Sequence, residues 1–164
     1  MFRGNVDTHY FVTHCKELLK QDHKFSPLEY NPPHENLKNT CKFYLHDNVD
    51  YHISDINDCF AEHVKSKEIH PRIVKLLKYG PGSYASIHTD NNFKGMPIIW
   101  TSITMLDQSK NNIGGNLILG DKEQYLETGD TVWYPVAFPH GVTKLYQGHR
   151  NVLVILWTSI YLTE

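Results

Sequence analysis

Residues 111–134, with the sequence NNIGGNLILGDKEQYLETGDTVWY, indicate the fold of the chain more directly than any other stretch. Two short β-rich runs, at residues 116–119 and 130–134, are bounded by clusters of Asn, Gly and Asp. These residue types favour tight turns, because they tolerate left-handed backbone conformations or hydrogen-bond their own backbone. Short runs bounded by such turns predict β-strands.

The same alternation of short runs and turn residues begins near Arg72 and continues almost to the end of the chain. We therefore predict further strands on both sides of the opening stretch. The predicted strands lie near residues 73–79, 84–89, 98–106, 116–119, 130–134, 140–145 and 149–158. Short strands at this spacing indicate a β-sandwich, a jelly roll or a barrel.

The N-terminal part of the chain has a different pattern. Apolar residues recur at helical spacing over residues 6–19 and 54–67, which predicts two helices. The 164 residues suit one compact domain. We therefore expect a single domain over residues 1–164 in the mainly β, α+β class, with helical support over about 1–70 and a barrel over about 72–160.

The composition excludes several classes of protein. Hydrophobic residues make up 40% of the chain and charged residues 21%, as in ordinary globular proteins. The net charge of -2, without a run of Lys or Arg, argues against bulk binding to nucleic acid or an anionic membrane. Cys15, Cys41 and Cys59 form no C-x-x-C motif, so buried free thiols are expected. The N-terminus shows no signal peptide, and we expect an intracellular, cytoplasmic protein.

His88 and Asp90 form the only H-x-D motif in the chain. Side chains two residues apart on a strand point to the same face, so both can reach one point inside a barrel. An imidazole and a carboxylate are two of the three ligands in the facial triad of non-haem iron(II) oxygenases. One H-x-D in a chain with 11 His also arises readily by chance. The motif therefore needs a third ligand.

His140 is the candidate for the third ligand, and Arg150 supports it. A hairpin loop at residues 146–148, with Gly148 in the left-handed region, would pair position 140 with position 154. Arg150 would then share the interior face of His140, about 13 Å along the strand. Its planar guanidinium can bind a carboxylate through two hydrogen bonds. The alternatives are a structural His140 at a strand start and, in another register, an Arg150 at the surface.

An ordered set of motifs covers residues 76–157. It consists of Tyr79-Gly80-Pro81-Gly82-Ser83-Tyr84, His88-Thr89-Asp90, Ile113-Gly114-Gly115-Asn116-Leu117, Gly129-Asp130-Thr131-Val132-Trp133-Tyr134-Pro135, His140-Gly141-Val142-Thr143 and Gly148-His149-Arg150. This set resembles the prolyl 4-hydroxylase-like branch of the 2-oxoglutarate oxygenases. No single motif is specific, but their order is.

The resemblance implies a double-stranded β-helix, similar to a jelly roll or cupin barrel, with Fe(II) bound by His88, Asp90 and His140. It implies that Arg150 pairs with the distal carboxylate of 2-oxoglutarate and that Tyr79 lines the cosubstrate pocket, although Tyr79 is equally a core aromatic. The implied reaction consumes dioxygen, converts 2-oxoglutarate to succinate and carbon dioxide, and hydroxylates a C–H bond. A prolyl residue in a peptide or protein is the leading substrate, with ascorbate as an optional reductant.

Some positions depart from the pattern of this family. Many relatives have a Trp six residues after the basic residue, where this chain has Leu156, and Trp157 follows on the opposite face. Lys144 falls on the predicted face of Arg150, and we expect it at the mouth of the barrel, in solvent. Residues 91–96, directly after Asp90, are either a substrate lid or a plain solvent loop.

Two other functions share part of this pattern. An AlkB-like nucleic-acid demethylase uses the same metal and cosubstrate, but it requires a basic groove and a base-flipping element, and the sequence shows neither. A non-enzymatic cupin-type metal-binding module typically has H-x-H on its metal strand and has no need of Arg150. The oxygenase is therefore the preferred interpretation.

Overall fold

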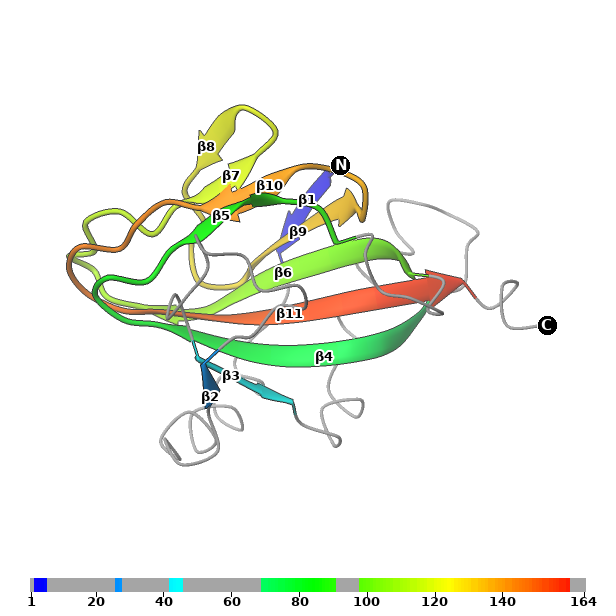
Figure 1. Ribbon diagram of the computed structural model, residues 1–164, viewed down its shortest axis with the longest axis horizontal. Helices are drawn as coiled ribbons and strands as arrows, with labels where there is room; N and C mark the ends of the chain where they lie inside the picture. The colour runs from blue at the N-terminus through cyan, green and yellow to red at the C-terminus, as the bar shows by residue number, and fades with distance from the viewer. Residues whose placement is uncertain (1, 6–25, 28–41, 46–68, 91–97, 160–164) are drawn as a thin grey trace.

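Two antiparallel sheets face each other in the computed structural model, which describes residues 2–5, 26–27, 42–45, 69–90 and 98–159 (Figure 1). The larger sheet has seven strands. In spatial order they are β1 (Phe2–Asn5), β9 (Asp130–Pro135), β6 (Ile98–Gln108), β11 (Arg150–Ser159), β4 (Ile69–Tyr79), β3 (Lys42–Leu45) and β2 (Ser26–Pro27). The smaller sheet has the order β5 (Ala85–His88), β10 (His140–Val142), β7 (Leu117–Leu119) and β8 (Lys122–Gln124).

All seven strands predicted beyond residue 72 are present, with bounds that differ by a few residues. Four additional strands, β1, β2, β3 and β8, were not predicted. The predicted helices at 6–19 and 54–67 lie outside the described residues. A mainly β architecture of two facing antiparallel sheets is thus established, and it is consistent with a double-stranded β-helix.

The core lies between the two sheets and follows from the alternation of side chains along the strands. On β11, Val152 and Val154 face the smaller sheet, whereas Leu153 and Ile155 are fully buried on the other face. Trp157 belongs to this second face, where its ring lies 5.0 Å from that of Trp133 and its indole N–H donates to the Ser102 hydroxyl at 2.9 Å. The central strands of the larger sheet are therefore buried on both faces.

The predicted hairpin between His140 and Arg150 is wrong. β10 pairs with β5 and β7, so His140 lies opposite His88 and Leu119 rather than Val154. After β10 the chain crosses from the smaller sheet to the larger one. In this crossing its backbone is hydrogen-bonded to the segment before β7, where the Tyr146 N–H donates to the Ile113 carbonyl at 2.8 Å. Consecutive strands of this fold occupy different sheets, and the pairing rule for a hairpin does not apply to them.

Gly148 has a φ of 95°, so the prediction of a left-handed glycine at the end of this crossing is confirmed. Beside it, His149 bridges the end of β6 to the start of β11. Its ring nitrogens lie 2.6 Å from the Ser109 hydroxyl and 2.9 Å from the Asp107 carboxylate, and its backbone N–H donates to the same hydroxyl. This bridge fixes the point at which β11 begins.

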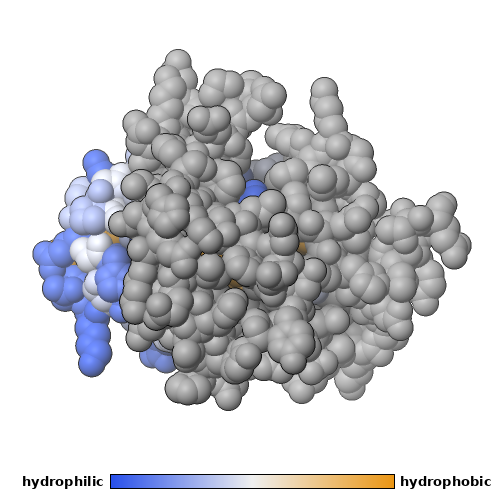
Figure 2. Space-filling model, turned by 90° about the horizontal axis from the view of Figure 1, so that it is seen from below, coloured by the Kyte–Doolittle hydropathy of each residue, from blue (hydrophilic) through white to orange (hydrophobic). Residues whose placement is uncertain are grey.

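The connections at this end of the sandwich form a hydrophilic surface, which is the coloured part of Figure 2. Exposed polar side chains there include Lys110, Asn111, Lys144, Gln147 and His149. No helix in the described part of the chain is long and apolar enough to cross a lipid bilayer.

Candidate metal and cosubstrate site

The three predicted metal ligands converge between the two sheets. His88 ends β5, His140 begins β10 directly opposite it, and Asp90 follows His88 by two residues. One ligand atom from each residue lies within 4.8 Å of those from the other two. The two imidazole centroids are 4.3 Å apart. The prediction that these side chains meet at one point is confirmed.

The backbone orients both histidine rings. The Nδ1 atom of His88 lies 2.6 Å from the Ser86 carbonyl, and that of His140 lies 3.0 Å from the Phe138 carbonyl. A carbonyl oxygen only accepts, so each Nδ1 carries the hydrogen. In the neutral imidazole the lone pair is then on Nε2, the atom that faces Asp90 in both residues. This is the tautomer that a metal ligand requires.

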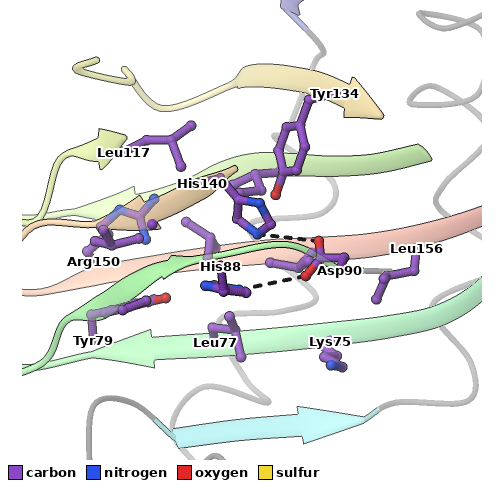
Figure 3. A pocket seen from close by; sticks show the side chains of 16 residues that line it. Lys75, Leu77, Tyr79, His88, Asp90, Leu117, Tyr134, His140, Arg150 and Leu156 are labelled. Atoms are coloured by element: carbon purple, nitrogen blue, oxygen red, sulfur yellow. Dashed lines mark ion pairs between the residues drawn. The ribbon is translucent and has the colours of Figure 1, made fainter. Parts of the chain in front are cut away.

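Asp90 connects the two histidines and is tied to the larger sheet. Its Oδ1 lies 3.7 Å from His88 Nε2, and its Oδ2 lies 3.3 Å from His140 Nε2 (Figure 3). The Thr101 hydroxyl donates to Oδ2 at 2.8 Å, and the Asp90 backbone N–H donates to the Val136 carbonyl at 2.9 Å. These two hydrogen bonds fix the position of Asp90, which lies outside the strand ladders.

The pKa of Asp90 is lowered from its ordinary value. Burial is the largest single effect and raises it, because a desolvated carboxylate loses its hydration. The hydrogen bond and charge that His140 supplies in its protonated form, the hydrogen bond from Thr101 and the charge of protonated His88 together outweigh burial. Asp90 is therefore an anion at neutral pH, ready to bind a cation.

A pocket opens beside the triad, and both sheets contribute to its lining (Figure 3). From the larger sheet come alternate residues of β4 and β11, namely Lys75, Leu77, Tyr79, Arg150, Val152, Val154 and Leu156, together with Ile103 of β6 and Tyr134 of β9. From the opposite side come Ala85, His88, Asp90, Leu117, His140, Gly141 and Val142. Nine of these sixteen residues are aliphatic or glycine, and seven carry polar groups.

Arg150 is the first residue of β11, and its side chain is 1% exposed. It pairs in register with Tyr79 of β4, and its guanidinium carbon lies 4.9 Å from the centroid of the Tyr79 ring. Figure 3 shows Arg150 and Tyr79 at one end of the pocket, Asp90 and Leu156 toward the other, and the histidines between. A buried guanidinium that faces a cavity is suited to binding an anion there.

The prediction that Arg150 faces the same interior as the histidines is confirmed, but by another route. The three candidate metal ligands belong to the smaller sheet or follow it, whereas Arg150 and Tyr79 belong to the larger sheet. The two groups meet because the sheets face each other, not because their strands are neighbours. Tyr79 lines the pocket and also packs in the core at 4% exposure, and its part in cosubstrate binding stays a prediction.

Other positions singled out in the sequence are also placed. Leu156 lines the pocket and Trp157 lies on the opposite face, as predicted. Lys144 is exposed, with its Nζ 5.5 Å from the Tyr146 ring, and it does not line the pocket. The lid or loop at 91–96 lies outside the described residues.

Sequence reasoning missed several residues near the triad. Thr101 bonds to Asp90, and the Tyr134 ring packs on His140 with centroids 4.6 Å apart. Thr101 and Tyr134 are also partners in the ladder between β6 and β9. Trp133-Tyr134-Pro135 belongs to one of the motifs in the sequence analysis, but nothing in the sequence indicates that the Tyr134 ring packs on His140.

The donor set fits a divalent first-row metal ion. Two imidazole nitrogens and one carboxylate oxygen are the ligands of the facial triad, a set used for Fe(II). The hydrogen bonds from the two histidine Nδ1 atoms to backbone carbonyls, and the one from Thr101 to Asp90, are the outer contacts that orient such ligands. The arrangement can hold a cation at the triad and an anion at Arg150.

No protein-family model and no curated protein matches the sequence. Solved structures do match the fold. A prolyl-4-hydroxylase from Pseudomonas putida is 13% identical with a TM-score of 0.72, covering 96% of this chain and 91% of that one. An oxidoreductase of the 2OG-Fe(II) oxygenase family from Burkholderia pseudomallei is 11% identical with a TM-score of 0.69, covering 92% and 78%.

A third similar structure is a prolyl hydroxylase from Trichoplax adhaerens in complex with a peptide fragment of the hypoxia inducible factor oxygen degradation domain. It is 15% identical with a TM-score of 0.67, covering 94% of this chain and 82% of that one. Identities this low establish the fold alone. The chain has the fold shared by these 2OG-Fe(II) oxygenases and prolyl hydroxylases.

Proposed function

We propose that this protein is an Fe(II)- and 2-oxoglutarate-dependent oxygenase that hydroxylates a C–H bond of its substrate. The observation that carries the proposal is the convergence of His88, Asp90 and His140 in a pocket that also contains the buried Arg150. The fold shared with oxygenase structures also supports it. A barrel with an unrelated function would not need both the triad and the buried Arg150.

Each ligand residue has a defined part in this proposal. His88 and His140 would bind Fe(II) through Nε2, and Asp90 through its carboxylate. When bound, the iron supplies the activation of dioxygen and the oxidative decarboxylation of 2-oxoglutarate to succinate and carbon dioxide. With three protein ligands, three coordination positions stay open for cosubstrate and dioxygen. Ascorbate is proposed as an optional reductant that would keep the iron in its ferrous state.

Arg150 and Tyr79 would orient the cosubstrate. The guanidinium can donate a pair of charge-assisted hydrogen bonds to the 5-carboxylate of 2-oxoglutarate, while the keto-acid end would point toward the triad. Leu117, Val142 and Val152 line the pocket with apolar surface. In such a low-dielectric environment the attraction between guanidinium and carboxylate is stronger than in solvent.

For the substrate we propose a prolyl residue in a peptide or protein. The support is the fold shared with two structures named as prolyl hydroxylases, one of which holds a peptide. The AlkB-like alternative gains no support from a chain of net charge -2 without basic runs. The cupin-type binding module would leave the buried Arg150 in the pocket without a purpose.

The direct test is succinate formation by the purified protein. With Fe(II), 2-oxoglutarate and dioxygen, the wild type should release succinate, and a proline-containing peptide pool should raise the rate. Asp90→Ala is the matched negative control, because it removes a metal ligand. Equal succinate release with and without Fe(II), or from wild type and Asp90→Ala alike, would contradict the proposal. A rate unchanged by every peptide would contradict the prolyl substrate alone.

A further inference from the structure

The geometry points to Thr101 as the residue that positions the Asp90 carboxylate: its hydroxyl holds Oδ2 and leaves Asp90 to bind the metal through a single oxygen. This inference rests on the proposed function, since it concerns the same metal. It adds a positioning role to a residue that has no place in the H-x-D…H pattern.

The contact is short and rigidly supported. The Thr101 hydroxyl lies 2.8 Å from Asp90 Oδ2, and Thr101 is 0% exposed. Its strand, β6, lies between β9 and β11 and pairs with both along this stretch. A β-branched side chain on such a strand has few accessible rotamers. The hydroxyl is therefore a fixed donor, and the carboxylate is the mobile partner.

Asp90 requires such a donor more than the histidines do. His88 and His140 belong to paired strands, and a backbone carbonyl holds each Nδ1. Asp90 lies beyond the end of β5, and its backbone N–H bond to Val136 fixes the main chain but not the carboxylate rotation. The hydrogen bonds that orient the two histidine rings involve backbone carbonyls, whereas the one that holds the Asp90 carboxylate comes from the Thr101 side chain. A mutation can therefore remove it without disturbing a strand ladder.

The consequence for the site is a defined number of open coordination positions. A carboxylate that turns freely can bind a metal through both oxygens and occupy a position that the cosubstrate or dioxygen requires. A hydrogen bond to Oδ2 opposes that binding mode. Thr101 would thus act on both the affinity of the metal and its coordination number.

Two substitutions separate the hydroxyl from the shape of the side chain. Thr101→Val removes the hydroxyl and keeps the volume, whereas Thr101→Ser keeps the hydroxyl and loses a methyl group. Thr104→Val is the matched control, because Thr104 is also buried in β6 and its hydroxyl bonds to Thr131, at 2.9 Å, instead of to Asp90. If Thr101→Val does not fold, Thr101→Ala and Thr104→Ala form the equivalent pair.

The measurement is Co(II) binding by calorimetry and visible absorption, without 2-oxoglutarate. Thr101→Val should bind Co(II) about 10- to 100-fold more weakly, as removal of outer contacts typically causes, and its absorption bands should change with coordination number. Thr101→Ser and Thr104→Val should behave as the wild type. Circular dichroism establishes that each variant is folded.

Three outcomes would overturn the inference while the proposed function stands. They are unchanged affinity and spectrum in Thr101→Val, an equal loss in Thr104→Val, and an equal loss in Thr101→Ser. If the wild type binds no Co(II), the proposed function fails and the role of Thr101 fails with it.

Discussion

His140 lies directly opposite His88 in the ladder between β10 and β5, and the two ring centroids are 4.3 Å apart. Backbone pairing sets this spacing, so the two imidazoles face the pocket together whether or not a metal is bound. The same ladder holds the strands when one ring is removed. Ligand loss and unfolding are therefore separable at this site.

His88→Ala should abolish Fe(II)-dependent succinate formation and leave the protein folded, because it removes one of three protein ligands but no backbone bond. Succinate assay and circular dichroism measure the two effects. Lys122→Ala is the control, since Lys122 is exposed on β8 and does not line the pocket. Wild-type succinate release from His88→Ala would refute the metal assignment.

Arg150→Ala should weaken 2-oxoglutarate binding by about two orders of magnitude, since charge-assisted hydrogen bonds contribute roughly 1.5–3 kcal/mol and each tenfold corresponds to about 1.4 kcal/mol. Fe(II) affinity should persist, because Arg150 is not a ligand. The 2-oxoglutarate affinity of Arg150→Lys should lie between those of the wild type and Arg150→Ala, because lysine keeps the positive charge but lacks the planar guanidinium. Anaerobic 2-oxoglutarate titration of the Fe(II) protein, followed by the metal-to-ligand absorption band, gives the cosubstrate affinity, and a separate metal titration without 2-oxoglutarate gives the metal affinity. Unchanged 2-oxoglutarate binding in Arg150→Ala would show that the anchor is elsewhere.

Leu156→Ala should reduce stability but not 2-oxoglutarate affinity. Leu156 is 2% exposed, and truncation of a buried leucine costs about 2–5 kcal/mol. It lines the pocket six residues along β11 from Arg150, so the anchor is untouched. Urea denaturation and the anaerobic titration measure the two effects. A large fall in 2-oxoglutarate affinity with little loss of stability would place Leu156 beside the cosubstrate instead.

Gly148→Ala should destabilise the protein by about 1–3 kcal/mol, the cost of a left-handed non-glycine residue. The φ of Gly148 is 95°, and an added Cβ would lie 1.8 Å from Asn112 Oδ1. That side chain has little freedom to move, because its Nδ2 donates to the His149 carbonyl at 2.9 Å. Gly80→Ala is the matched control, because a Cβ there meets nothing within 4 Å. Equal thermal unfolding of the two variants would contradict this explanation.

Seven of the strands and the candidate site residues could be predicted from sequence, because both have local signals. Turn residues mark the strand ends, and parity along one strand places His88 and Asp90 on one face. The pairing of β10 could not be predicted in this way. Its partners come from residues 85–88 and 117–119, and only the crossing between sheets selects them.

Thr101 shows the same limit. Its contact with Asp90 joins β6 of the larger sheet to a residue just beyond the end of β5, 11 residues away in sequence, and a buried threonine on a β-strand has no sequence feature that indicates a hydrogen bond. Arg150 was placed inward for a reason that proved wrong, since its neighbours in the ladders are Tyr79 and Gln108. The hairpin register indicated that Arg150 faces the interior, but the chain reaches that position by a crossing between the two sheets.

The separation between the candidate iron ligands and Arg150 is a property of the two sheets and not of either one alone. His88 and His140 lie in the smaller sheet, and Arg150 lies in the larger sheet. Under the proposed function, the thickness of the packed layer between them would set the length of the diacid that fits. A variant that changes the volume of this layer, such as Leu117→Phe, would shift selectivity between 2-oxoglutarate and a shorter or longer diacid while every ligand stays in place.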